Sequence, residues 1–285
     1  MTVNIDVEID ESGKKRLAAI AIALLAGALI VSGVVFFLLD DSDTNAPDNN
    51  TTSQQFGPGY DQNEITNVTE LLESHNQSVS QYSSYRARIG IVTQLNNETT
   101  EQTRRFVRDG SGDVPQVRTF INNERVDAEQ YYDFQNNVLL VQSEQNGSVS
   151  YNSGPLRQGQ EYRFTAVRFL GPRLGGLNTT YVEDSVYNGT DVRVYSITGL
   201  SEEALNGTED ADSIQVSGSI QIATEDNSIR TVNLEVVDTD PSQPALTNRV
   251  VQQQLVIDRV GATTVSPPEW LETARERTNA TPPQP

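Results

Sequence analysis

Hydrophobic and polar residues alternate along much of the chain from residue 85 to residue 260, the pattern of β-strands with one dry and one wet face. The clearest run is 214–222, where Ile, Val and Gly alternate with Gln and Ser. The segment 225–228 turns the chain into 229–237, and a loop with Pro241 and Pro244 leads to 249–260. Further strands are predicted at 85–95, 103–108, 116–121, 138–143, 181–187 and 191–197. The pattern therefore predicts a large antiparallel sheet.

Three segments have helical features instead. Apolar residues recur at three- and four-residue steps over 64–82, which predicts a helix that Asp61 caps. A second helix is predicted over 160–174, broken at Gly171-Pro172, and Pro267-Pro268 predict the start of a third near Trp270. An apolar sheet face must be covered, so we expect these helices to lie on it. The fold class is α+β.

The N-terminal region contains a segment suited to crossing a membrane. Leu17–Leu39 has 23 residues without a charge, and as a helix it would reach about 34 Å, enough for a hydrocarbon core of about 30 Å. Lys14–Arg16 precede it and Asp40 and Asp41 follow it, which places 1–16 in the cytoplasm and the rest outside. A cleaved signal peptide has a shorter apolar core, and Ala26-Gly27-Ala28 lies inside the segment. We expect a single-pass transmembrane anchor in the cell membrane with an extracellular C-terminal domain.

Composition divides the exported part into three regions. Residues 40–59 contain no Val, Ile or Leu and form an acidic polar tether. Residues 60–274 show no comparable break and are predicted to be one domain. Residues 275–285 are polar and end in Pro-Pro-Gln-Pro, which predicts a disordered tail.

The charge balance bears on habitat and partners. The chain has 39 acidic and 20 basic residues, a formal charge of −19, and only two of the basic residues are lysines. This balance excludes nucleic acid, whose backbone binds basic surfaces. Many carboxylates with almost no lysine are typical of proteins from salt-loving archaea, because such a surface stays hydrated and repels its neighbours at high salt.

The chain is poor in residues that carry catalysis or bind metals. It has no Cys and one His, His75, which excludes thiolate chemistry and sites with several His ligands. His75 lies on the apolar side of the first predicted helix, where a structural role is expected. The acidic run 208–212 lacks the ligand spacing of an EF-hand and is interpreted as a solvated loop. We expect no enzyme activity, catalytic residue, metal or cofactor.

Asparagine placement agrees with an exported chain. Ten of the 22 asparagines begin an Asn-x-Ser/Thr sequon, and all ten follow the predicted anchor. Several also fit plain turn chemistry, so the excess of sequons, more than any one site, suggests a glycosylated surface protein. The candidate glycosylation sites are Asn49, Asn50, Asn67, Asn76, Asn97, Asn146, Asn178, Asn188, Asn206 and Asn279.

Three motifs and the order of elements resemble a known superfamily. The motifs are YSITG at 195–199, VSGSIQI at 216–222 and, most specific, VGATTVSPPEWLETA at 260–274. Over residues 60–274 the chain resembles the LolA-type lipoprotein carriers and the LppX/LprG-type lipid-binding lipoproteins, and more narrowly the haloarchaeal surface lipoproteins of that superfamily. It lacks the lipid-modified Cys of the family, which the segment 17–39 would replace. The resemblance implies a curved sheet, an open half-barrel, whose concave apolar face is closed by helices and holds a lipid.

The expected function follows from that face. We expect the protein to hold or shuttle a lipid or other hydrophobic ligand at the cell surface. The alternative is a glycosylated cell-envelope interaction or structural protein whose sheet is solidly packed and binds no ligand. The candidate lining residues are Ile89, Ile91, Ile220, Ile222, Val232 and Leu234.

Overall fold

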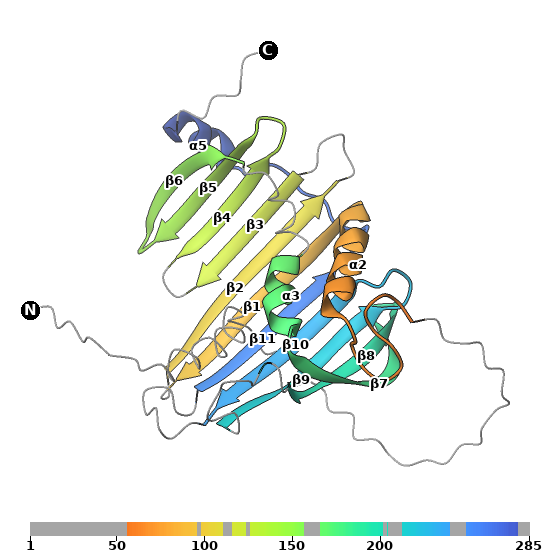
Figure 1. Ribbon diagram of the computed structural model, residues 1–285. Coiled ribbons are helices and arrows are strands. Elements are labelled where there is room, and N and C mark those ends of the chain that lie inside the picture. The colour runs from red at the N-terminus through yellow and green to blue at the C-terminus, as the bar shows by residue number, and fades with distance from the viewer. Residues whose placement is uncertain are drawn as a thin grey trace, which may run out of the picture.

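The alternating segments form an antiparallel sheet of eleven strands in the computed structural model (Figure 1). The structure describes residues 56–95, 98–110, 116–123, 126–156, 166–201, 204, 213–239 and 249–278. In chain order the strands are β1 (Ser84–Leu95), β2 (Glu98–Asp109), β3 (Gln116–Asn123), β4 (Asp127–Asp133), β5 (Val138–Gln145), β6 (Ser148–Pro155), β7 (Leu177–Tyr187), β8 (Thr190–Leu200), β9 (Ile214–Ala223), β10 (Ile229–Asp238) and β11 (Arg249–Asp258).

Two meanders meet at the centre of this sheet. The strands β1 to β6 follow one another across one half, and β7 to β11 follow one another across the other. The pairing of β1 with β11 joins the halves, so that Leu255 lies opposite both Ile89 and Val232. Two strands that are far apart in sequence, β1 and β11, therefore join the halves at the middle of the sheet. The sheet is open, with β6 and β7 as its edges.

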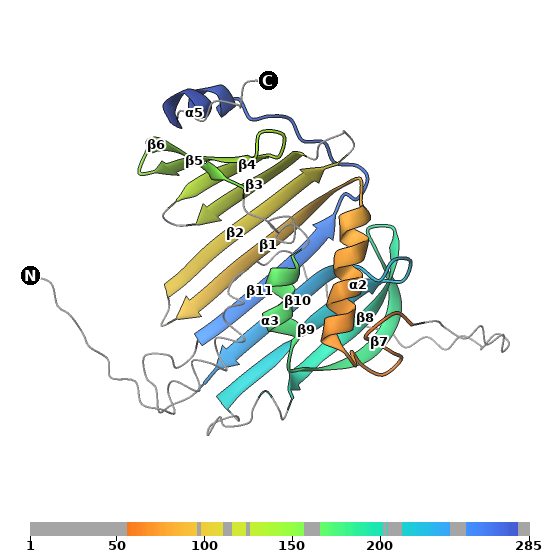
Figure 2. The same cartoon turned by 45° about the horizontal axis from the view of Figure 1, so that its top comes forward.

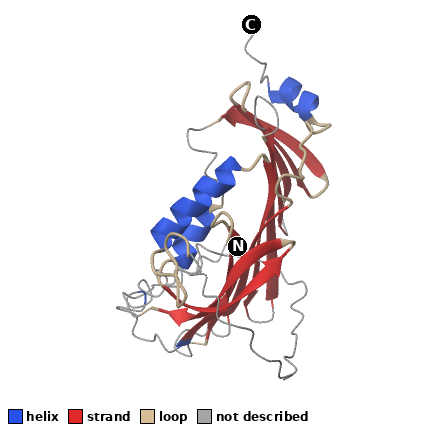
Figure 3. Ribbon diagram, turned by 90° about the vertical axis from the view of Figure 1, so that its right-hand side faces the viewer, coloured by secondary structure: helices blue, strands red, loops and turns tan. Residues whose placement is uncertain are grey.

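The sheet has two faces with different covers. On one face, which we call the helix face, lie α2 (Val68–Gln81) and α3 (Val167–Leu174). The opposite face, which we call the outer face, carries α5 (Leu271–Thr278), as the side view shows (Figure 3). Consecutive residues of β4 point to opposite faces. Tyr132 belongs to the main core on the helix face, and Tyr131 belongs to a small cluster with Leu271 on the outer face.

The position of α5 corrects the expectation that all three helices cover the same face. Leu271 and Ala274 pack against Leu140 and Tyr131 on the outer face, because β5 carries apolar residues on both of its sides. The helix also continues to Thr278, four residues beyond the predicted domain boundary. Helix cover of the helix face is consequently small for a sheet of this width: α2 and α3 lie over β1 and β8–β11 (Figure 2).

Several boundaries differ from the sequence prediction for identifiable reasons. The helix α2 begins after Asn67, whose carboxamide oxygen accepts from the backbone N–H groups of Thr69 and Glu70. Asp61 instead accepts from the backbone of Asn63 and Glu64 in a separate turn, so it is not the cap. The helix α3 runs unbroken through 171–172. The strands β4 and β6, which were not predicted, lack clear apolar alternation.

The predicted anchor at 17–39 lies outside the described residues. Within the part of the chain that the structure describes, no helix has the length and apolar character needed to cross a membrane. The folded part begins earlier than residue 60, since the ring of Phe56 makes edge-on contacts with Tyr60 and Tyr181.

Candidate ligand site on the helix face

The six residues predicted to line a ligand site all lie on the helix face. Ile220 is opposite Val232, which is opposite Leu255, and Leu255 is opposite Ile89. Ile89, Ile220, Ile222, Val232 and Leu234 are buried in the main core, and Ile91 is partly exposed. The structure thus brings the six together, with five of them in a packed interior and Ile91 at its margin.

Polar contacts fix α2 over this interior. The backbone N–H of Ile229 donates to Nδ1 of the fully buried His75 at 3.0 Å, which requires that this nitrogen carry no proton. Ser78 donates to the backbone carbonyl of Asp226, and the Tyr82 hydroxyl contacts the Asp226 carboxylate and Ser228. One face of α2 is therefore fastened to the turn between β9 and β10.

The carboxylate of Asp226 is the charged group in the contacts that hold α2 on the β9–β10 turn. Burial raises the pKa of Asp226, but hydrogen bonds from Tyr82 and Ser228 and the charge of Arg230 outweigh it, so that the pKa lies below its ordinary value. The Arg230 guanidinium lies 3.4 Å from Asp226. The ionised form of Asp226 is thus the one that the fold stabilises.

A second polar contact holds α3 in the middle of the apolar interior. Arg173 is buried, and its Nε donates to Oε1 of Gln253 on β11 at 3.1 Å. The guanidinium also lies over the ring of Phe169 and donates to the Phe169 carbonyl. Burial lowers the pKa of Arg173 to about 9. Gln253 faces Ile91 and Leu234 across its two neighbouring strands, so a cation sits among residues predicted to touch a ligand.

Beyond α3 the helix face continues across β3–β5 without a described helix above it (Figure 1). In this region, which we call the open half, Val117 and Tyr132 are buried but four apolar residues remain partly exposed, whereas those under α2 and α3, the covered half, are buried. The four partly exposed residues are Ile121, Phe134, Leu139 and Val141. Ile121, Leu139 and Val141 lie on the predicted strands 116–121 and 138–143, but the sequence alone does not show which part of the apolar face the helices leave uncovered.

The registers show that these residues share the helix face. Ile121 lies opposite Arg104, which lies opposite Ile89. Leu139 lies opposite Tyr132, and Tyr132 opposite Val117, a core residue. The two halves are consequently joined through the core residues Phe106, Val117 and Tyr132, whereas the exposed Arg104 lies between Ile89 and Ile121.

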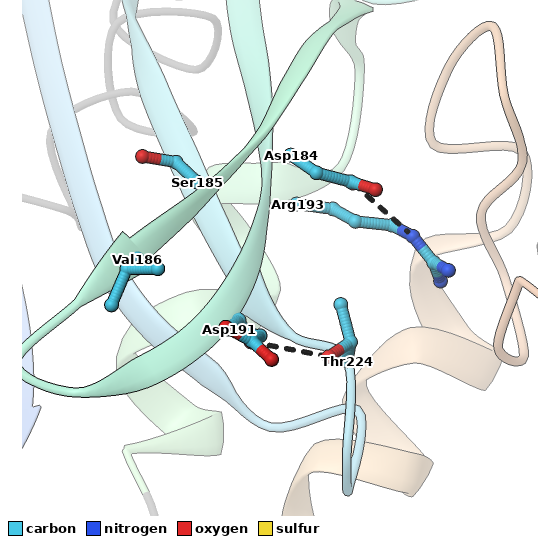
Figure 4. Close-up of a pocket in the computed structure, with 6 residues that line it drawn as sticks. All are labelled: Asp184, Ser185, Val186, Asp191, Arg193 and Thr224. Carbon is cyan, nitrogen blue, oxygen red and sulfur yellow. Dashed lines mark hydrogen bonds and ion pairs between the residues drawn. The ribbon is translucent and has the colours of Figure 1, made fainter. Parts of the chain in front are cut away.

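A separate hollow of about 440 Å³ lies at the far edge of the sheet (Figure 4). Its lining combines charged and small side chains, namely Asp184, Ser185, Val186, Asp191, Arg193 and Thr224. The Arg193 guanidinium points away from Asp191 and Thr224 and lies over the ring of Phe56. Its lining residues are mainly charged or hydroxyl-bearing, and it includes none of the six residues predicted to line a ligand site.

The described sequons occupy several kinds of position. Asn67 caps α2 and Asn76 lies within it. Asn146 and Asn188 occupy hairpin turns with positive φ, and the Asn178 amide donates to the Leu200 carbonyl on β8. The sequons at Asn49, Asn50, Asn97, Asn206 and Asn279 lie outside the described residues.

Comparisons with known proteins give structural neighbours only. No family model matches the sequence, and no curated protein matches it. The lipoprotein LppX of Mycobacterium tuberculosis aligns at 10% identity over 70% of this chain and 98% of its own, with a TM-score of 0.36. LprF from Mycobacterium bovis aligns at 12% identity over 70% and 94%, with a TM-score of 0.34.

A LolA superfamily protein from Nitrosomonas europaea aligns at 10% identity over 70% of this chain and 94% of its own, with a TM-score of 0.26. The TM-scores of these three neighbours are all below 0.5, so they do not establish the superfamily of this chain. None of these similarities identifies a ligand for this chain.

Proposed function

We propose that this chain is a membrane-anchored extracytoplasmic protein that holds or shuttles a lipid or other hydrophobic ligand at the cell surface. The ligand would lie on the helix face where the open half meets α3. One observation carries this proposal: the apolar surface continues past the helices and stays partly exposed at Ile121, Leu139 and Val141. Soluble domains rarely leave contiguous apolar surface uncovered unless it binds something.

The position of α3 supports entry at this margin. The helix is eight residues long and bounded by Gly175 and Gly176, of which Gly176 has a φ of 81°. Its contacts with the core are the buried side chains of Leu170 and Leu174 and the hydrogen bond of Arg173 with Gln253. A cover of eight residues is smaller than the fourteen-residue α2, so we expect α3 to be displaced at lower cost than α2.

A test starts from the protein in its own membranes. Native mass spectrometry of the full chain, gently extracted, should show a population heavier than the glycosylated polypeptide by the mass of one lipid. A chain that carries only its own mass and glycans, under conditions that keep it folded, contradicts the proposal.

A matched pair of substitutions places the ligand. Val141→Asp adds a charge to the open half of the helix face, and Val149→Asp adds the same charge to the outer face, where Val149 is 43% exposed. We expect the first variant to lose most of the co-purified lipid, because a carboxylate is strongly disfavoured beside an acyl chain. The second should retain it. Equal retention in both variants excludes the open half as the site.

Anchoring is a separate part of the proposal, supported by the charge step from Lys14–Arg16 to Asp40 and Asp41 around an apolar segment. Protease treatment of intact cells should release the folded domain into the medium. A protected domain, or a mature N-terminus at residue 33 or beyond, contradicts it.

The alternative function, a cell-envelope interaction protein with a solid sheet, rests on the complete burial of Ile220 and Ile222 under the helices. In that case the open half would be the contact surface for another protein. The two functions separate on the mass measurement, since a protein partner leaves no lipid on the purified chain. Both are binding functions, and we propose no catalytic role for any residue.

A further inference from the structure

The outer face of the sheet carries a group of arginines that has no part in the lipid proposal. Arg86 and Arg88 lie on β1, Arg105 on β2 and Arg118 on β3, all on the side opposite the core residues Ala87, Phe106 and Val117. We call these four residues the arginine cluster. In a chain with a formal charge of −19, four cations on three adjacent strands stand out.

Two arginines of the cluster, Arg86 and Arg118, lie in one row on either side of Val107 and are neutralised by carboxylates. Arg86 makes a two-pronged contact with Asp258, with N–O distances of 2.7 and 2.6 Å, which is the strong, planar pair that a guanidinium forms with a carboxylate. Nε and Nη2 of Arg118 both contact one oxygen of Glu129, and Nη1 of Arg118 donates to the Ser266 carbonyl at 3.1 Å.

The other two arginines, Arg88 and Arg105, lie in the next row of the same face and are not neutralised in this way. Arg88 and Arg105 lie directly opposite each other on β1 and β2, a like-charged pair that destabilises a sheet. Arg88 is 49% exposed in its side chain and comes no closer than 3.8 Å to Asp258. Among the described residues Arg105 has no carboxylate within ion-pair distance, and its Nε, though buried, has no hydrogen-bond partner.

The surroundings hold the Arg105 guanidinium in place. It stacks over the ring of Phe120 at 4.1 Å, and Arg118 approaches the same ring at 5.2 Å. Burial, together with the charges of Arg86, Arg118 and Arg88, lowers the pKa of Arg105, and the charge of Glu129 opposes this shift. A stacked guanidinium loses little freedom on binding, so it is well placed to receive an anion.

We propose that Arg88 and Arg105 bind a phosphoryl oxyanion on the outer face, while Arg86 and Arg118 keep the site positively charged. Four cations against the two carboxylates Asp258 and Glu129 leave a local charge of +2, which a phosphate monoester or two phosphodiesters would balance. The backbone positions of Arg88 and Arg105 are directly opposite, and the exposed Arg88 side chain can turn so that both guanidinium groups donate to the oxygens of one tetrahedral anion. This proposal is independent of the ligand on the helix face.

The phosphoryl group could belong to free phosphate or to a phospholipid headgroup, and two probes distinguish these sources. Inorganic phosphate and dihexanoyl phosphatidylglycerol below its micelle concentration are titrated into the full chain by calorimetry at constant potassium chloride. Binding of phosphate alone identifies the free anion as the source, and binding of the lipid alone identifies the headgroup. Binding of both supports the phosphoryl group itself as the recognised chemistry.

Matched variants assign the binding to the cluster. Arg105→Gln and Arg88→Gln each remove one donor group, and we expect the Kd to rise by about tenfold or more for each. Arg104→Gln is the control, because Arg104 is an exposed neighbour of Arg105 on the helix face and the change of charge is the same. Its Kd should stay within about twofold of the parent value.

Stability without added anion checks that the variants fold. Arg105→Gln removes both a ring contact and a like-charge repulsion, so its melting temperature should stay close to that of the parent. Adding phosphate should raise the melting temperature of the parent and not that of the variant. Absence of binding by both probes, equal loss in Arg104→Gln, or a preference for a diglutamate peptide over phosphate would each overturn the proposal.

Discussion

The two halves of the helix face share one pattern of alternation and differ in what covers them. In the covered half Ile220, Val232 and Leu255 are buried under α2 and α3, whereas in the open half Leu139 and Val141 remain partly exposed. Strand periodicity is the same on both sides of β1. The comparison shows that alternation decides which face of a sheet is apolar and that helix cover extends the burial of this face, although Val117 and Tyr132 are buried without a described helix above them.

The halves also differ in the face on which a helix contacts them. In the covered half the polar groups of α2 join His75, Ser78 and Tyr82 to the β9–β10 turn. The helix α5 covers β5 and β6 from the outer face, where Trp270 donates to Glu129 at 2.9 Å and Arg275 to Asp133 at 2.8 Å. The contacts of α5 on the outer face thus stabilise the strands of the open half, and the apolar helix face of these strands stays accessible to a ligand.

The largest expected difference concerns leucines at equivalent positions. Leu255→Ala, at a fully buried site of the covered half, should lower the free energy of unfolding by about 2–5 kcal/mol. Leu139→Ala, in the open half, should lower it by about 1 kcal/mol, because less of its side chain leaves water on folding. Urea unfolding at constant salt measures both. Equal losses would mean that the open half is as tightly packed as the covered half.

A second substitution asks whether the covered half contains space for a ligand. Ile220 is fully buried between strand and helix cover, so Ile220→Trp should overpack the core and lower stability by about 1–3 kcal/mol. Thermal unfolding of the full chain, with and without lipid extraction, gives the measurement. Unchanged stability accompanied by loss of lipid would instead place the ligand beneath α2.

The smallest expected effect is the pH dependence of the stability that Asp226 gives to the contact between α2 and the β9–β10 turn. Because the pKa of Asp226 is lowered in the folded state, its contribution is present above the unfolded pKa of about 3.9 and is lost as the pH falls through the folded value. Asp226→Asn should lower stability by about 1 kcal/mol at pH 7. The gap between parent and variant should close as the pH falls below about 4, measured by urea unfolding in a pH series. A gap that does not change with pH would show that the carboxylate charge is not what fastens α2.

Much of the sheet could be predicted from the sequence, since strands β9, β10 and β11 alternate cleanly and carry turn residues between them. The strand β4 could not, because its side chains 127–133 are polar on both sides until Tyr131 and Tyr132. The edge strand β6 is mostly exposed and polar, so no apolar signal marks it. A strand that buries little side-chain area on either face has no apolar pattern in the sequence, and only its pairing with neighbouring strands in the structure reveals it.

The candidate site was predicted in part. Ile89 and Ile91 were identified from alternation, and the structure places Ile89 in the buried core and Ile91 at its margin. The open-half residues and the arginine cluster depend on registers between strands, which a single sequence does not determine. The position of α5 depends on the outer face of β5, where Leu140 had no predicted role.

Photo-crosslinking with a diazirine fatty acid tests the central claim most directly, because it reports where an acyl chain lies on the full protein. After irradiation and digestion, we expect modified peptides from β3–β5 and from α3, and we expect Val141→Asp to remove them while Val149→Asp leaves them in place. Labelling confined to the outer face, or labelling that both variants leave unchanged, would contradict the account that the open half of the helix face is a ligand site.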